Sequence, residues 1–206
     1  MICKKQKVIF CHIPKTAGQS IEKAIISNVG LSHEDRGKFL LGFNNESNKG
    51  PRRLAHLFLS EYKELGHISN EKFAEYFKFT IVRNPYSRLI SELNYRNVPI
   101  QPIEKYVNSI PKLYYKDKWR HICPQTFYIY DGKSLNTEIN KIYYFEKLSE
   151  AFADLKRRLF CANIYLSHEN KSLNKSWIKE KLTRNDLDFI NDYYDLDFKM
   201  LGYKKL

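Results

Sequence analysis

The sequence predicts an α/β protein with three layers, in which helices cover both faces of a central, mostly parallel sheet. Runs of β-branched and aromatic residues, typical of buried strands, lie at residues 7–12, 78–82 and 141–145. Stretches with apolar residues at helical spacing separate these runs. Strands that alternate with helices indicate a parallel sheet, because a helix is the usual crossover between parallel strands.

The expected helices are defined by their apolar faces and by the residues at their ends. Residues 19–29 form an amphipathic stretch that stops at Gly30. Asn84 can cap a helix that Pro85 begins, because proline tolerates the first helical position. No repeat or long linker divides the chain, so residues 1–206 are expected to form a single domain. Further helices are expected at 69–77, 102–110, 147–159 and 183–194.

The composition is that of a globular, basic protein. Its hydrophobic fraction of 43% excludes a disordered chain. The 35 Lys and Arg against 23 Asp and Glu give a formal net charge of +12. That charge favours an anionic partner such as a nucleotide, an acidic glycan, a nucleic acid or a membrane surface. The basic residues are scattered and no nucleic-acid-binding motif occurs, so we expect no nucleic-acid partner.

The four cysteines form no CxxC pair and have no metal-ligand spacing. We interpret them as reduced thiols of a cytoplasmic protein, because two disulfides would require an exported chain. The apolar stretch at the N-terminus is too short for a signal peptide, and no segment is long enough to span a bilayer. We therefore expect a cytoplasmic location and no transmembrane segment.

A first anion site is indicated by residues 7–25, KVIFCHIPKTAGQSIEKAI, which are typical of a strand, a tight turn and a helix. A helix N-terminus offers unpaired N–H groups and the positive end of the helix dipole. Lys15 adds a charge, and the small residues Ala17 and Gly18 let the backbone approach a phosphate. The alternative is a plain strand–turn–helix junction with a lysine on the surface. Side-chain donors are supplied by Thr16, Gln19 and Ser20.

A second anion site is indicated by residues 79–95, FTIVRNPYSRLISELNY. Arg83 follows directly after a strand and can make a forked contact with a phosphate. Ser87 and Ser91 lie one turn apart on the next helix, so that a serine can complete the contact. Alone, such an arginine is usually an ion-pair partner on the surface. Because ligands of α/β sheets bind at the carboxyl ends of the strands, two such stretches together predict one pocket.

At these residues the chain resembles a known family. HIPKTAGQS is similar to the 5′-phosphosulfate loop of sulfotransferases, in the branch that includes the carbohydrate 2-O-sulfotransferases (sulfotransferase family 2). RNPYSRLIS resembles the 3′-phosphate motif of that family, an arginine followed eight residues later by a serine. Weaker similarity continues through CPQTFYIYDG, YYFEKL, LSHENKS and YYDLDFKMLGY, so it covers nearly the whole chain.

The resemblance implies a P-loop-like α/β/α fold and a reaction without a metal. The implied donor is 3′-phosphoadenosine 5′-phosphosulfate (PAPS), which leaves as adenosine 3′,5′-bisphosphate (PAP), and the implied acceptor is a hydroxyl of a carbohydrate. Lys171 and Ser172, in LSHENKS, are candidate nucleotide contacts, whereas Gln125 is given no role. The family motifs place the 5′ end of the donor on Lys15, Thr16, Ala17, Gly18, Gln19 and Ser20, and its 3′-phosphate on Arg83 and Ser91.

Sulfuryl transfer requires a base for the acceptor hydroxyl, and histidine suits neutral pH. His56, in RRLAHLFLSEY, lies between the two motifs, where the resembling enzymes place their catalytic histidine; the alternative is a structural histidine ahead of a helix. Lys15 is expected to balance charge on the leaving group, and Glu92 is the substitute base. His12 is expected to support the loop. No neighbours indicate a role for His33, His67, His121 and His168.

Two other classes of function are compatible with the charge. A P-loop kinase or other nucleotide phosphotransferase needs the pattern GxxxxGK[ST] and an acidic metal ligand, and the chain contains no such loop. A non-catalytic polyanion-binding protein would account for the charge alone. Acceptor recognition is expected from loops such as 31–55 and 96–124, where Arg52 and Arg53 favour an anionic acceptor.

Overall fold

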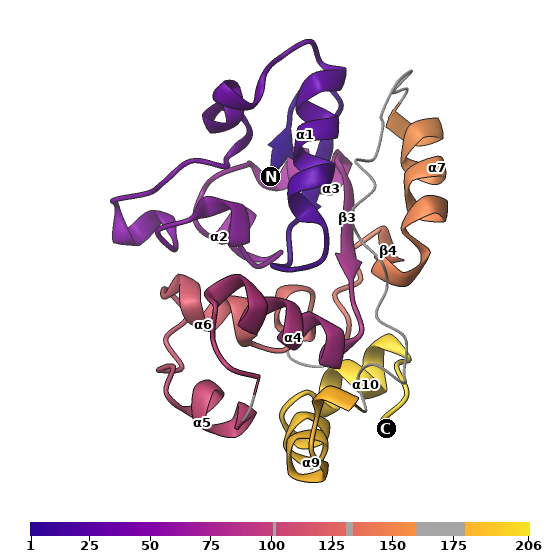
Figure 1. The fold of residues 1–206 in the computed structure, drawn as a ribbon. Coiled ribbons are helices and arrows are strands. Elements are labelled where there is room, and N and C mark those ends of the chain that lie inside the picture. Colours follow the sequence, from indigo (N-terminus) through magenta and orange to yellow (C-terminus); the bar gives the residue numbers. More distant parts are fainter. Residues whose placement is uncertain (101, 131–133, 160–179) are drawn as a thin grey trace.

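The computed structural model describes residues 1–100, 102–130, 134–159 and 180–206 (Figure 1). In these residues β2 pairs with β3, and β3 with β4, in parallel, as predicted. The strands form one sheet in the order β1–β2–β3–β4, with bounds Ile2–Cys3, Val8–Cys11, Phe77–Val82 and Lys141–Tyr144.

The sheet is mixed, and the prediction of a mostly parallel sheet was wrong at its first edge. β1 pairs antiparallel with β2, which places Ile2 opposite Ile9. Only residues 4–7 join these two strands, and so short a turn can only reverse the chain, whereas a parallel partner needs a crossover of a dozen residues or more. A strand of two residues carries no periodic signal, so the sequence did not indicate it.

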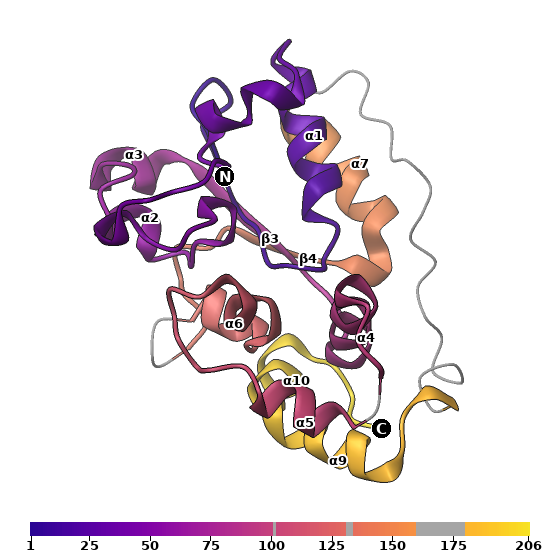
Figure 2. The same ribbon diagram turned by 60° about the vertical axis from the view of Figure 1, so that its left-hand side comes forward.

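Helices cover both faces of the sheet. Along β2, Val8 and Phe10 point to one face, whereas Ile9 and Cys11 point to the other. The first face packs against α1 (Gly18–Asn28) and α7 (Leu148–Leu159), which lie next to each other in Figure 2. The core on the other face includes residues of α2 (Glu61–Glu64), α3 (Asn70–Glu75), α4 (Pro85–Arg96), α5 (Ile103–Asn108), α6 (Asp117–Ile122), α9 (Arg184–Tyr193) and α10 (Asp195–Leu201).

Each predicted helix is present, with ends that differ by a few residues. Asn84 caps α4 as predicted, because its side chain accepts hydrogen bonds from the N–H groups of Tyr86 and Ser87. The short helices α6 and α10 were not predicted, since six or seven residues give too few turns for a hydrophobic period. The 3₁₀ segments of the described residues were not predicted either: η1 (His33–Phe39), η2 (Ser47–Lys49), η3 (Leu54–His56), η4 (Gln125–Tyr128) and η5 (Phe145–Lys147).

A buried arginine fixes the elements that surround the carboxyl edge of the sheet. Arg88 of α4 is 1% exposed, and its guanidinium donates to the carbonyl oxygens of Pro14 at 3.1 Å, Cys123 at 2.8 Å and His121 at 2.9 Å. It therefore ties α4 both to the loop after β2 and to α6. A charged donor with several partners is among the stronger hydrogen-bonding groups in proteins, so this junction is rigid.

Two further predictions concern the thiols and the membrane. Cys3, Cys11 and Cys123 are buried and free, as predicted, and Cys161 lies outside the described residues. Among the residues that the structure describes, no helix is long and apolar enough to cross a membrane. The cytoplasmic location stays a prediction.

Candidate active site

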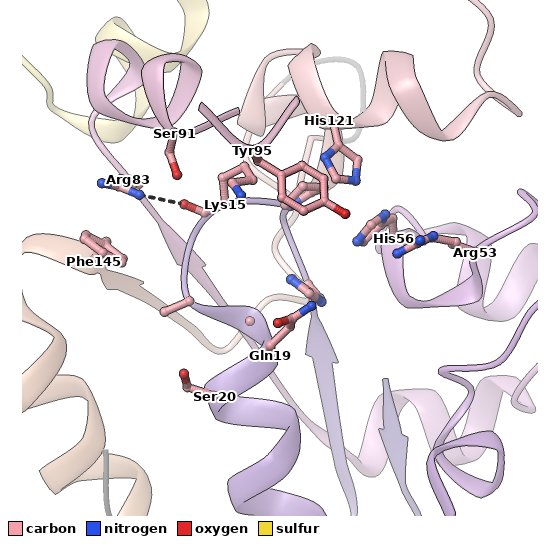
Figure 3. Close-up of a pocket in the computed structure, with 14 residues that line it drawn as sticks. Lys15, Gln19, Ser20, Arg53, His56, Arg83, Ser91, Tyr95, His121 and Phe145 are labelled. Carbon is pink, nitrogen blue, oxygen red and sulfur yellow. Dashed lines mark hydrogen bonds between the residues drawn. The ribbon is translucent and has the colours of Figure 1, made fainter. Parts of the chain in front are cut away.

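A cavity of about 270 Å³ opens at the carboxyl edge of the sheet, where the loop after β2, the end of β3 and α4 meet (Figure 3). Thr16 does not line it, and Lys171 and Ser172 lie outside the described residues. It is also lined by residues given no catalytic role from the sequence: His12, Arg53, Tyr95, His121 and Phe145. The predicted site residues that line it are Lys15, Ala17, Gly18, Gln19, Ser20, His56, Arg83 and Ser91.

The loop after β2 leaves the N-terminus of α1 open toward the cavity. Lys15 has φ 70° and Ala17 has φ 71°, a left-handed conformation that costs a residue with a side chain about 1–2 kcal/mol. The hydroxyl of Thr16 is buried and donates to the carbonyl oxygen of Ile13 at 2.7 Å, so it holds the turn instead of facing a ligand. Ala17, the N-cap of α1, makes no side-chain capping bond. The first N–H groups of α1 are therefore suited to an anion.

Close packing with His12 explains the glycine that begins α1. A Cβ added at Gly18 would lie 1.9 Å from Nε2 of His12, so no other residue fits. The His12 ring is 6% exposed and its Nδ1 lies 2.6 Å from Oε1 of Glu22, on α1. His12 thus fixes the loop against the helix, in line with the supporting role predicted for it, and also forms part of the cavity wall.

Arg83 lies at the other end of the cavity, at the end of β3. Its Nη1 donates to the carbonyl oxygen of Lys15 at 3.2 Å and its Nε donates to Oγ of Ser87 at 3.3 Å. Its guanidinium stacks over the Phe145 ring at 4.1 Å. Burial lowers the pKa of Arg83 to about 10, so the group still carries its charge at neutral pH. Ser91, one turn beyond Ser87, lines the same cavity.

Figure 3 shows Arg83 and Phe145 on one side of the loop and His56 on the other side. Nδ1 of His56 lies 2.8 Å from Oδ1 of Asp117, and burial lowers the pKa of His56 to about 3. Burial opposes ionisation of Asp117, but the hydrogen bond and charge of His56 prevail and lower its pKa to about 2. An ionised carboxylate can only accept, so Nδ1 of the neutral ring carries the proton and Nε2 keeps its lone pair. This is the state that a general base requires.

His121 lies beside His56, and the sequence prediction that it has no helpful neighbours was wrong. The two ring centroids are 4.8 Å apart. Nδ1 of His121 lies 2.8 Å from Oε2 of Glu92, and Oε1 of Glu92 accepts from Nε of Arg96 at 2.7 Å. Glu92 is buried and does not line the cavity, so the proposed substitute base is instead a partner of two neighbours. The sequence signal was the separation of four residues that places Asp117 and His121 on one helix face.

Lys15 and Tyr95 form the wall between these two ends. The Nζ of Lys15 lies 4.1 Å from the centroid of the Tyr95 ring. Burial lowers the pKa of Lys15, although the charge of Glu92 opposes this effect. Tyr95 is 56% exposed and stacks on His121 with ring centroids 6.1 Å apart. The lysine is thus held at the cavity mouth by an aromatic face, a contact that an anionic ligand can replace.

Among the residues that the structure describes, one group of side chains could hold a metal ion. Ligand atoms of His56, Asp117 and His121 lie within 4.8 Å of one another. A cation there would have to displace the hydrogen bond between His56 and Asp117. It would also lie close to Arg53, whose Nε is 3.8 Å from Asp117 Oδ2. The donor set therefore suits a hydrogen-bonded histidine–carboxylate pair better than a cation.

The comparisons with known proteins fit this geometry. The model of the sulfotransferase family matches residues 1–127, more than half of the chain, including both anion-site motifs. The chain belongs to the sulfotransferase family. No solved structure gave a significant match.

Curated relatives are carbohydrate sulfotransferases. Over 91 residues the chain is 33% identical to carbohydrate sulfotransferase 10 of Rattus norvegicus, 35% identical to that of Gallus gallus and 32% identical to that of Homo sapiens. Each match covers 44% of this chain and 23% of the relative. The chain therefore spans less than a quarter of the length of the curated relatives it matches.

Proposed function

We propose that this protein transfers a sulfuryl group from PAPS to a hydroxyl of a carbohydrate acceptor, in line and without a metal. The observation that carries the proposal is one cavity with two chemically different ends. One end has the open N-terminus of α1 together with Lys15, Arg83 and Ser91. The other end has the neutral His56, which is hydrogen-bonded to the ionised Asp117. The family match and the carbohydrate sulfotransferase relatives support the same reaction class.

At the donor end, the backbone of residues 17–20 and Lys15 bind the 5′-phosphosulfate, and Arg83 with Ser91 binds the 3′-phosphate. In the transfer step the acceptor oxygen forms a bond to sulfur as the bond from sulfur to the 5′-phosphate oxygen breaks. PAP leaves with that electron pair, and the hydroxyl proton passes to Nε2 of His56. Asp117 stabilises the resulting imidazolium, and Lys15 balances charge on the departing phosphate.

The acceptor is proposed to enter past Arg53, which lies 3.8 Å from Asp117 and faces the cavity beside His56 (Figure 3). A second cation, Arg52, lines a larger groove that also includes Asp117. Exposed arginines next to a reacting hydroxyl favour an acceptor that carries a negative charge near its point of sulfation.

A ligand titration tests the donor assignment. PAP binds only the folded protein under this proposal, so at 100 times its Kd it should add about 2.7 kcal/mol to the free energy of unfolding and raise Tm. ATP with Mg²⁺ should raise Tm less. A larger shift with ATP would support a nucleotide phosphotransferase instead, and no shift with either ligand would favour a protein that binds polyanions without catalysis.

A further inference from the structure

Two buried nitrogens around Glu92 lack a hydrogen-bond partner. In the part of the chain that the structure describes, the buried side-chain polar atoms without a partner are Nη2 of Arg96, Nε2 of His121 and Nε1 of Trp119. The first two belong to the residues that share the Glu92 carboxylate. Folded proteins pair nearly all buried polar groups, because an unpaired group has lost its water without compensation. Two unpaired nitrogens on residues that share one carboxylate indicate a ligand that forms the missing hydrogen bonds.

The residues that carry these two nitrogens line two neighbouring hollows. His121 lines the cavity of the proposed donor site, and Arg96 lines a larger groove of about 950 Å³. Asp117 lines the groove and contacts two residues of the cavity. Its Oδ1 lies 2.8 Å from Nδ1 of His56, and its Oδ2 lies 3.6 Å from Nε2 of His121. Asp117 thus links the two hollows, with Arg96 on the side of the groove and His121 on the side of the cavity.

The protonation states define what the two nitrogens can bind. Burial opposes ionisation of Glu92, but hydrogen bonds and charge from His121 and Arg96 lower its pKa below the ordinary value, so it is a carboxylate. Nδ1 of His121 must then donate to it, which leaves Nε2 to form a hydrogen bond with another partner. Nη2 of Arg96 can only donate. Hydroxyl groups both donate and accept, so adjacent hydroxyl groups can satisfy Nη2 of Arg96 and, in either protonation state of the ring, Nε2 of His121.

The walls of the groove fit the same ligand chemistry. Amide and hydroxyl side chains are supplied by Asn44, Ser47 and Ser109, and an aromatic face by Tyr115, which is 58% exposed. Aromatic faces beside small polar groups suit a sugar ring, which has apolar C–H faces and a rim of hydroxyl groups.

We propose that Glu92 holds Arg96 and His121 as an acceptor subsite, which binds hydroxyl groups of the sugar next to the one that is sulfated. Nε2 of His121 forms a hydrogen bond with one hydroxyl, and Nη2 of Arg96 donates to a neighbouring oxygen. The subsite orients the sugar so that the reacting hydroxyl faces Nε2 of His56. This inference rests on the proposed function, because the sugar is the acceptor of that reaction.

Substitutions at His121 separate its two nitrogens. His121→Asn keeps a donor near the position of Nδ1 but has no atom at Nε2, whereas His121→Gln places an amide near Nε2. Arg96→Gln removes the charged donor. Matched controls are His67→Asn, a half-buried histidine whose Nε2 lies 2.8 Å from the Lys49 carbonyl oxygen, and Arg184→Gln, an exposed member of an ion pair with the same spacing of four residues as Arg96 and Glu92.

The assay measures transfer of radiolabelled sulfuryl from PAPS to dextran, heparosan and unsulfated chondroitin, with PAP affinity measured by calorimetry. Loss of a hydrogen bond to His121 should raise the acceptor KM about threefold to tenfold in His121→Asn. Loss of the stronger hydrogen bond from the charged Arg96 should raise it about tenfold or more in Arg96→Gln. The rise should be smaller in His121→Gln. PAP affinity should change less than twofold, and both controls should match the wild type.

The possible failures are distinguishable. An unchanged acceptor KM in His121→Asn and Arg96→Gln, with transfer intact, would overturn the subsite alone. So would variants in which PAP binding and acceptor binding weaken to the same extent. If the wild type binds PAP and sulfates none of the three polysaccharides, the proposal of a carbohydrate acceptor fails, and the proposal of the subsite fails with it. If the wild type does not bind PAP, the proposed function fails at the donor.

Discussion

Replacement of His56 by asparagine tests the proposed base without emptying its site. The asparagine amide can still donate toward Asp117, which now accepts from Nδ1 at 2.8 Å, but no atom remains at the position of Nε2. A positioned base contributes on the order of 10²–10⁴ in rate, equivalent to about 2.7–5.5 kcal/mol of barrier, and turnover should fall by that amount. PAP affinity should stay within twofold, because His56 contacts only the acceptor in the proposed mechanism. Sulfuryl transfer and calorimetry measure the two effects separately.

The pH dependence of the wild type follows from the same residue. Burial lowers the pKa of His56 to about 3, whereas the ordinary value is about 6.5. The neutral ring is then present throughout pH 5–8, so turnover should show no titration near pH 6.5, in contrast to the ordinary histidine titration that sequence alone would suggest. Between about pH 6 and pH 4 the unfolded chain binds a proton at this position and the folded chain does not. Folding stability should therefore decrease as the pH is lowered from 6 to 4, by up to about 1.4 kcal/mol per pH unit, and His56→Asn should remove that part of the slope.

Two results would refute the reasoning about His56. One is near-normal turnover in a folded His56→Asn protein, which would place the base elsewhere. The other is a wild-type rate that titrates near pH 6.5 and loses this titration in the variant, which would mean that burial does not keep His56 neutral. His67→Asn is the control in both experiments, because that histidine does not line the cavity and its Nε2 lies near the Lys49 carbonyl oxygen instead.

Other expected outcomes concern the donor end. Arg83→Ala should weaken PAP binding by about 1.5–3 kcal/mol and Ser91→Ala by about 0.5–1.5 kcal/mol, whereas the exposed Arg157→Ala should have no effect; calorimetry that finds all three unchanged would remove the 3′-phosphate assignment. Gly18→Ala should abolish PAP binding and lower Tm, because its Cβ would lie 1.9 Å from His12 Nε2, and a variant with normal affinity would contradict the close packing of the loop. Transfer activity should survive EDTA; complete loss that Mg²⁺ restores would contradict a reaction without a metal.

The end of the cavity proposed for the donor could be predicted from the sequence because its parts are local. Residues 12–20 form one continuous segment, the loop after β2 and the first residues of α1, and Arg83 and Ser91 lie at the end of one strand and on the helix that follows it. Strand and helix signals were enough to place both at one edge of the sheet. Thr16 is the exception, because the residue type shows a donor but not its direction, and the fold turns its hydroxyl toward Ile13.

The acceptor end was mostly inaccessible for the opposite reason. His56 and its partner Asp117 are 61 residues apart, and Glu92 and His121 are 29 apart. Asp117 and His121 lie on α6, a helix too short for a periodic signal. Only the tertiary fold brings these side chains together, so the sequence named His56 through resemblance, left its partner unidentified and gave His121 no role.

Burial of His56 would offset an effect of the proposed donor. PAPS would bring several negative charges into a small cavity, and such charges raise the pKa of a nearby histidine. An exposed histidine, with a pKa of about 6.5, would then be protonated at pH 7 and could not act as a base. With its pKa lowered to about 3, His56 stays neutral unless the donor stabilises the imidazolium by more than about 5 kcal/mol, the equivalent of four pKa units. Arg83, whose pKa burial lowers only to about 10, remains charged in the same cavity, so the cation proposed to bind the donor and the neutral base proposed to activate the acceptor can coexist at one pH.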